Sequence, residues 1–148
     1  MTGTDTAPPP VAVTAALSGL DRVLELLPGQ SGTAVRNVPA TWTLLATHFP
    51  RKPVMPGVLI VDDLATLAGL VADAARTGPE RGDWSMTSVR RVRWRHFVQP
   101  GDCVELTVSR LGGVEGDPAF RGTVRVDGRT VTTVAELRVR WTPWGVER

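Results

Sequence analysis

One run near the middle of the chain combines residue types that proton chemistry needs. His48 lies in a proline-rich segment that ends at Pro56, and Asp62 follows fourteen positions later in an otherwise apolar stretch. A histidine can act as a general base near neutral pH, and an isolated carboxyl group is costly to bury. The run therefore predicts a site that moves protons, with His48 and Asp62 as its candidate catalytic side chains.

The residues after Pro56 predict one long helix over residues 57–76. Proline at the start and Gly78-Pro79 beyond the end are typical helix boundaries. The segment is apolar on almost every face, so we expect protein to surround it. One stripe of polar or small residues is the exception, and it predicts either the lining of a cavity or a solvent-exposed strip: Asp62, Thr66, Gly69 and Asp73.

Strands are predicted before and after this helix. Residues 33–38 indicate a strand, residues 15–27 indicate a strand or a short helix, and alternation with period two begins at Trp84. The later segments are predicted as strand 104–109, loop 112–118, and strands 120–126 and 130–141, the last two joined by the hairpin signal Asp127-Gly128. The order predicts an α+β fold, in which an antiparallel sheet wraps around one long central helix.

Composition narrows the class of protein. The 148 residues are 42% hydrophobic, which predicts one folded domain over residues 13–148 after a disordered tail at residues 1–12. The net charge of +2 does not indicate a nucleic-acid binder. A single cysteine, Cys103, excludes an intrachain disulfide, and no His or Cys pair has metal-ligand spacing, so we expect no metal and no cofactor. No signal peptide or membrane span is predicted, and we expect a cytoplasmic protein.

The run from His48 to Leu64 resembles the (3R)-hydroxyacyl-acyl-carrier-protein dehydratases. Their motif is His-Phe-Pro-Gly-x-Pro-x-Met-Pro-Gly-x-Leu, with an acidic residue fourteen positions after the histidine, and the resemblance extends over residues 17–141. It implies the hot-dog fold and a dimer whose sites combine the histidine of one subunit with the acid of the other. Arg51 replaces a glycine of the motif, Asp62 stands where glutamate is usual, and Thr66 replaces a glutamine. These departures favour a specialised member, in fatty acid biosynthesis or, with more support, in polyketide-type biosynthesis.

The resemblance implies a role for each residue of the motif. His48 would remove the α-proton of a 3-hydroxyacyl thioester, and the backbone N–H of Gly57 would stabilise the enolate-like oxygen. Asp62, kept protonated by burial, would protonate the leaving hydroxyl group. We expect the neighbouring Asp63 to be structural and paired with an arginine. His96 is interpreted as a structural strand residue, on one face with Val92, Trp94 and Val98.

The expected partner is an acyl carrier protein bearing a phosphopantetheine-linked acyl chain. Carrier proteins are acidic, and the candidate docking residues are basic: Arg51 and Lys52 beside the motif, and Arg91, Arg93 and Arg95 in the strand after the helix. Alternation predicts that these last three project from one face, which is either a docking surface or a solvated strand face. The second protein partner is another hot-dog subunit, in a homodimer or a heterodimer.

The leading interpretation is an enzyme that forms trans-2-enoyl thioesters, and the Asp62 variant of the motif leaves isomerisation to a cis-3 double bond open. A non-catalytic or partner-dependent subunit of a heterodimeric dehydratase is the first alternative, because Thr66 lacks the usual bracing amide. An acyl thioesterase is the second alternative. It would need a carboxylate that activates water, and the histidine motif is not what that chemistry requires.

Overall fold

The computed structural model describes residues 19–39 and 54–145, and in these residues one antiparallel sheet accompanies one long helix. The elements, in chain order, are β1 (Arg22–Leu27), β2 (Ser31–Asn37), α3 (Gly57–Ala74), β3 (Gly82–Trp94), β4 (Cys103–Val114), β5 (Asp117–Val126) and β6 (Arg129–Pro143). The strands are arranged in the order β1-β2-β4-β5-β6-β3, with every neighbouring pair antiparallel. In this part of the chain, no helix has the length and apolarity that crossing a bilayer would demand.

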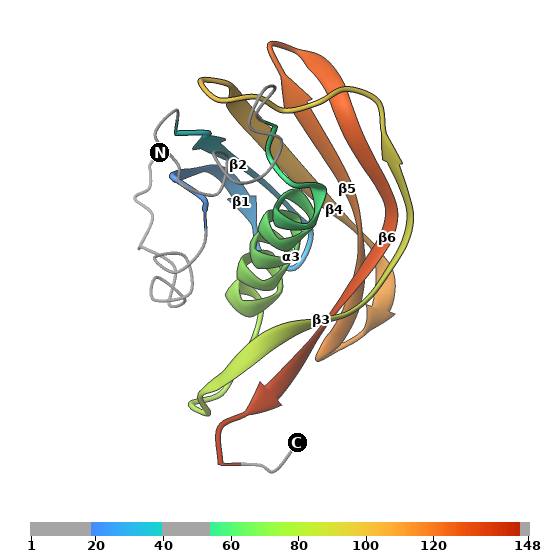
Figure 1. Ribbon diagram of the computed structural model, residues 1–148. Coiled ribbons are helices and arrows are strands. Elements are labelled where there is room, and N and C mark those ends of the chain that lie inside the picture. Colours follow the sequence, from blue (N-terminus) through green and yellow to red (C-terminus); the bar gives the residue numbers. More distant parts are fainter. Residues whose placement is uncertain (1–18, 40–53, 146–148) are drawn as a thin grey trace.

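The sheet curls around α3, which lies against its concave face (Figure 1). The helix begins directly after Pro56, whose φ of −59° suits a helix start, and the chain turns away at Gly78, whose φ is +101°. Strands β2 to β6 all contact α3. The predicted α+β fold with a sheet wrapped around a central helix is therefore confirmed, and so is the predicted start of the helix.

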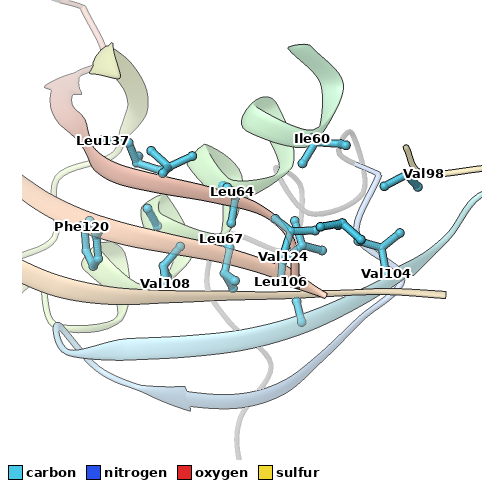
Figure 2. Close-up of a cluster of buried hydrophobic side chains, with 14 of the residues drawn as sticks. Ile60, Leu64, Leu67, Val98, Val104, Leu106, Val108, Phe120, Val124 and Leu137 are labelled. Atoms are coloured by element: carbon cyan, nitrogen blue, oxygen red, sulfur yellow. The ribbon is translucent and has the colours of Figure 1, made fainter. Parts of the chain in front are cut away.

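The core lies between α3 and the concave face of the sheet (Figure 2). Leu64 and Leu67 of the helix are fully buried against inward side chains of β4, β5 and β6. Two strand glycines allow this close approach. A Cβ atom at Gly32 would lie 2.6 Å from the Cγ2 atom of Val71, and one at Gly122 would lie 3.0 Å from the Cδ1 atom of Leu64. The sheet can therefore approach the helix most closely where strands β2 and β5 carry no side chain.

Two predicted connections had different outcomes. The hairpin at Asp127-Gly128 is confirmed, and both residues have the positive φ angles, 53° and 77°, of a tight type I′ turn. The loop predicted for residues 112–118 is wrong, because β4 continues to Val114 and β5 starts at Asp117. Gly113 and Gly116 adopt positive φ angles in a second hairpin formed by β4 and β5. The glycine-rich composition therefore indicated a bulged strand end with a short turn rather than a long loop.

Strand β3 forms one edge of the sheet, and the middle of the strand is exposed to solvent. Every residue from Ser85 to Arg91 is exposed, although these positions alternate between the two faces of the sheet. The pairing with β6 shifts between Met86 and Ser88, and Arg91 has a φ of +55°. The strand ends at Trp94, so placing His96 inside it with Val92 and Val98 was wrong. His96 is an exposed residue of the bend after the strand.

Candidate functional site

The start of α3 presents backbone N–H groups to an open cavity. Pro56 at the N-cap makes no side-chain capping bond, and the first turn carries no acidic residue. The first-turn amides of Gly57 and Val58 precede the intrahelical bonds and lie at the positive end of the helix dipole. A cavity of about 630 Å³ adjoins this helix end, and it is lined by Val54, Met55, Pro56, Gly57, Ile60, Trp94, Arg95, His96, Phe97 and Val98. This end of the helix could hold an oxygen atom that gains negative charge.

Glycine is required at position 57 by a close packing contact. A Cβ atom there would lie 2.6 Å from the Cη2 atom of Trp94, well inside van der Waals contact. The indole ring of Trp94 is half exposed and covers one side of the helix start. Gly57 thus brings an apolar wall next to backbone donors, and such a wall would shield a bound thioester oxygen from water.

Asp62 lines a different cavity, on the flank of the helix that faces β3. This cavity of about 260 Å³ is bounded by Asp62, Ala65, Thr66, Gly69 and Leu70 of α3 and by Gly82, Asp83, Trp84, Ser85 and Met86 of β3. The expectation that the polar stripe lines a cavity is confirmed for Asp62, Thr66 and Gly69. The expectation that Asp62 is buried is wrong for the single chain, because its side chain is exposed where the open strand β3 leaves the helix uncovered.

Thr66 does not brace the carboxylate of Asp62. Its hydroxyl group donates to the backbone carbonyl oxygen of Asp62 at 3.1 Å, which is the usual bond from a helical threonine to the preceding turn. The carboxylate itself makes no hydrogen bond or ion pair with another residue in ranges 19–39 and 54–145. Within these ranges, no side chain competes with a ligand for the carboxylate of Asp62.

The neighbouring Asp63 has the opposite environment. Its side chain is buried, with 4% exposure of the residue, and its Oδ2 atom lies 2.7 Å from the Nη1 atom of Arg36, which is 6% exposed. Burial raises the pKa of the Asp63 carboxyl group, and the charge and hydrogen bond of Arg36 oppose that rise. The expectation of a structural Asp63 paired to an arginine is confirmed. Two adjacent carboxyl groups thus differ completely: one fastens the helix to β2, and the other points into a cavity.

Gly57 and Asp62 point in different directions on one helix. Five residues separate them, which corresponds to about 140° of rotation and about 7.5 Å along the axis. They accordingly line two separate cavities. The third predicted member, His48, and the two basic residues Arg51 and Lys52 lie outside the described residues.

The basic residues of β3 divide into two groups. Arg91 and Arg93 line a shallow depression of about 280 Å³ on the outer face of the sheet, together with Arg121 of β5. Arg95 instead lines the cavity at Gly57, so the prediction that all three share one face is wrong. The physical reason is that β3 ends at Trp94, and Arg95 belongs to the bend beyond it. Sequence reasoning missed Arg121, although the alternation of its strand is a signal that could have placed it on the outer face.

No group of three or more acidic, histidine or cysteine residues is placed to hold a metal ion within the two described ranges. Cys103 is a free, exposed cysteine at the start of β4, as expected.

Comparisons with known proteins found a matching family model and several similar chains. The family model of the FabA-like domain matches residues 13–135. A 3-hydroxyacyl-acyl-carrier-protein dehydratase FabZ of Granulibacter bethesdensis is 41% identical over 113 residues, which are 76% of this chain and 66% of that protein. The FabZ of Burkholderia thailandensis is 38% identical over 120 residues, 80% of this chain and 74% of that protein. This chain thus spans about two thirds to three quarters of these relatives.

A solved structure, the dehydratase heterocomplex ApeI:P from Xenorhabdus doucetiae, shares the fold with a TM-score of 0.70. The similarity covers 86% of this chain and 85% of that one, at 16% sequence identity. The sheet wrapped around one helix is therefore the hot-dog fold that the sequence resemblance implied.

Proposed function

The chain belongs to the FabA-like family, and from that premise we propose that it dehydrates 3-hydroxyacyl thioesters carried by an acyl carrier protein, forming trans-2-enoyl thioesters. The observation that carries the proposal is the environment of Gly57 and Asp62. One supplies uncapped backbone donors at a helix start, and the other supplies a carboxylate without a partner in the described chain. Carrier-bound 3-hydroxyacyl chains are what the FabZ names of the relatives specify.

The proposed reaction is a balanced transfer of protons. His48 takes the α-proton, and electron density moves to the thioester oxygen, where the N–H of Gly57 stabilises it. The bond from C3 to its hydroxyl oxygen breaks as Asp62 delivers a proton, and water leaves. A proton then returns from His48 to Asp62, so both groups are reset without a cofactor.

The site requires a second subunit, because Gly57 and Asp62 of one chain open into separate cavities. We assign the complementary half to a second copy paired along β3, the open sheet edge. Met86, Val89 and Trp94 of this strand are large apolar residues exposed to solvent, and an exposed strand edge is a template for pairing. His48 and Gly57 would then act with Asp62 of the partner subunit. Covering the Asp62 cavity would also exclude bulk water from the reacting groups.

The experiment monitors a carrier-bound 3-hydroxyacyl chain by mass spectrometry after incubation with the protein. Loss of water supports the dehydratase, whereas loss of the whole acyl group identifies a thioesterase. His48→Ala should reduce dehydration by about 10²–10⁴-fold. His96→Ala tests the competing base, because His96 also lines the cavity at Gly57. If His96→Ala abolishes turnover and His48→Ala does not, the assignment of the base is wrong.

Mixing the two inactive variants tests the shared site. A dimer that contains one His48→Ala chain and one Asp62→Asn chain holds one intact site, so the mixture should recover part of the activity. A protein that sediments as a monomer and still turns over normally would contradict the shared site.

A second candidate function is that of a subunit that depends on a different hot-dog partner. The observation that favours it is the bond of the Thr66 hydroxyl to a backbone carbonyl, which leaves Asp62 without the brace that a glutamine would supply. In that case the purified protein leaves the substrate unchanged, and activity returns only when the partner is added.

A further inference from the structure

The indole of Trp84 separates two cavities along the flank of α3. Trp84 lines the Asp62 cavity of about 260 Å³, and it also lines a larger cavity of about 550 Å³ beyond it. Of the residues that the structure describes, Trp84 is the one common to both linings. The larger cavity adjoins the end of the helix, where Ala72 and Ala75 face Phe120 of β5.

Trp84 is held in place on several sides. Its Nε1 atom donates to the Oδ1 atom of Asp73 at 2.9 Å. The same oxygen lies 3.4 Å from the Nε atom of Arg76, whose guanidinium group stacks 4.4 Å from the centre of the Trp141 ring. Trp141 is also the cross-strand partner of Trp84 in the pairing of β3 with β6. These contacts restrict the indole to one orientation.

The helix approaches Trp84 closely at a second small residue. A Cβ atom at Gly69 would lie 3.1 Å from the Cβ atom of Trp84. The absence of a side chain at Gly69 therefore lets β3 place the indole across the groove beside the helix. Asp73, the last residue of the stripe predicted from the sequence, then serves to anchor this wall rather than to line the Asp62 cavity.

We propose that Trp84 closes the inner end of the acyl-binding cavity and limits the length of the acyl chain that the protein accepts. This inference rests on the proposed function, in which Asp62 lies beside C3 of the acyl chain. The axial distance from Asp62 to Gly69, where the indole begins, is about 10 Å for seven helical residues. An extended backbone advances about 3.5 Å for every three bonds, so the groove holds roughly eight or nine bonds beyond C3.

The wall therefore selects chains of up to about twelve carbons. A longer chain must displace a clamped indole to reach the larger cavity. Removing the indole joins the two cavities, and the apolar residues beyond it become available to the end of the chain.

The test measures binding of saturated acyl-pantetheines with 4, 8, 12 and 16 carbons by calorimetry. These probes lack the 3-hydroxyl group, so they report the depth of the cavity whether or not the protein turns over substrate. We expect the wild-type protein to bind the 8-carbon probe better than the 16-carbon probe. In Trp84→Ala the ratio of 16-carbon to 8-carbon affinity should rise at least about tenfold, since even one methylene group that fits or fails to fit changes selectivity by roughly 10–200-fold.

The matched control is Trp144→Ala, which removes an indole that is 57% exposed and lines neither cavity. Its length profile should equal that of the wild type. If Trp84→Ala does not fold, Asp73→Ala is the second variant, because it removes the hydrogen bond that anchors the indole and leaves Trp84 in place. The dependence of binding on acyl length in Asp73→Ala should shift in the same direction by a smaller amount. A folded variant at either position with the wild-type profile would overturn the inference, as would a wild-type protein that binds no acyl probe.

The same series distinguishes this inference from the proposed function. In one outcome, the protein dehydrates no 3-hydroxyacyl chain and still binds acyl probes by length, with Trp84→Ala allowing longer probes to bind. That result would contradict the proposed dehydratase and support the role of Trp84 as the wall of the cavity. Dehydration with a length preference that Trp84→Ala leaves unchanged would support the dehydratase and overturn the wall.

Discussion

Replacing each of the two adjacent aspartates of α3 by asparagine should separate catalysis from stability. Asp63→Asn removes the carboxylate from a pair whose charged atoms are 2.7 Å apart and whose residues are 4% and 6% exposed. Because burial raises the pKa of Asp63, the site tolerates a neutral group, and the cost of Asp63→Asn is the weakened hydrogen bond to Arg36, about 1–3 kcal/mol. Asp62→Asn changes an exposed side chain, and its effect on the free energy of unfolding should stay within about 0.5 kcal/mol.

The assay pairs urea and thermal unfolding with turnover of a carrier-bound 3-hydroxyacyl chain. Asp63→Asn should lower the midpoint of thermal unfolding by roughly 5 °C and retain activity while folded. Asp62→Asn should unfold like the wild type and lose about 10²–10⁴-fold in turnover. The reasoning is refuted if Asp62→Asn is the destabilised variant or if folded Asp63→Asn is the inactive one.

The pH dependence of stability gives an independent check on the Asp63–Arg36 pair. Burial raises the pKa of Asp63 in the folded state above the ordinary value of 3.8, so the folded state binds a proton more tightly than the unfolded state. This contribution to stability is fully present below pH 3.8 and is lost as the pH rises through the folded-state pKa. Arg36→Met removes the attraction that opposes the shift, so its loss of stability should be smaller at pH 4 than at pH 7. A loss that is equal at both pH values would contradict this account.

Three further predictions concern the surface, the core and a turn. Replacing Arg91 and Arg93 by glutamate should raise KM for the carrier-bound substrate at low salt and leave turnover on a short thioester mimic unchanged. The reason is that exposed charges steer the association of a charged partner and are screened by salt. An unchanged KM would mean that this face of the sheet contacts only solvent. Gly32→Ala should cost about 1–3 kcal/mol in urea unfolding, because its Cβ would lie 2.6 Å from Val71. Gly128→Ala should cost about 1 kcal/mol, because its φ is +77°, and a stable variant would show that the turn can change type.

Local patterns in the sequence determined the helix, the strands and the identity of the family. The helix start was readable because Pro56 precedes a long apolar segment, and proline favours a first helical turn without restricting the residues after it. The Asp127-Gly128 hairpin was readable because both residues tolerate positive φ. The second hairpin was not, because Gly112 and Gly113 stay paired in the ladder beside a bulge, and composition alone does not distinguish a bulged strand end from a loop.

Only the tertiary structure decided which side chains meet. Whether Asp62 or Asp63 is buried depends on which flank of the helix the sheet covers, and the sequence places both in the same apolar segment. Arg95 lies apart from Arg91 and Arg93 because β3 ends at Trp94. The period-two pattern of the sequence continues past this residue, so it does not indicate where the strand ends. Trp84 and Asp73 are eleven residues apart on different elements, so their contact depends on the register between helix and sheet. Long-range packing sets that register, and the spacing of residues along the chain does not encode it directly.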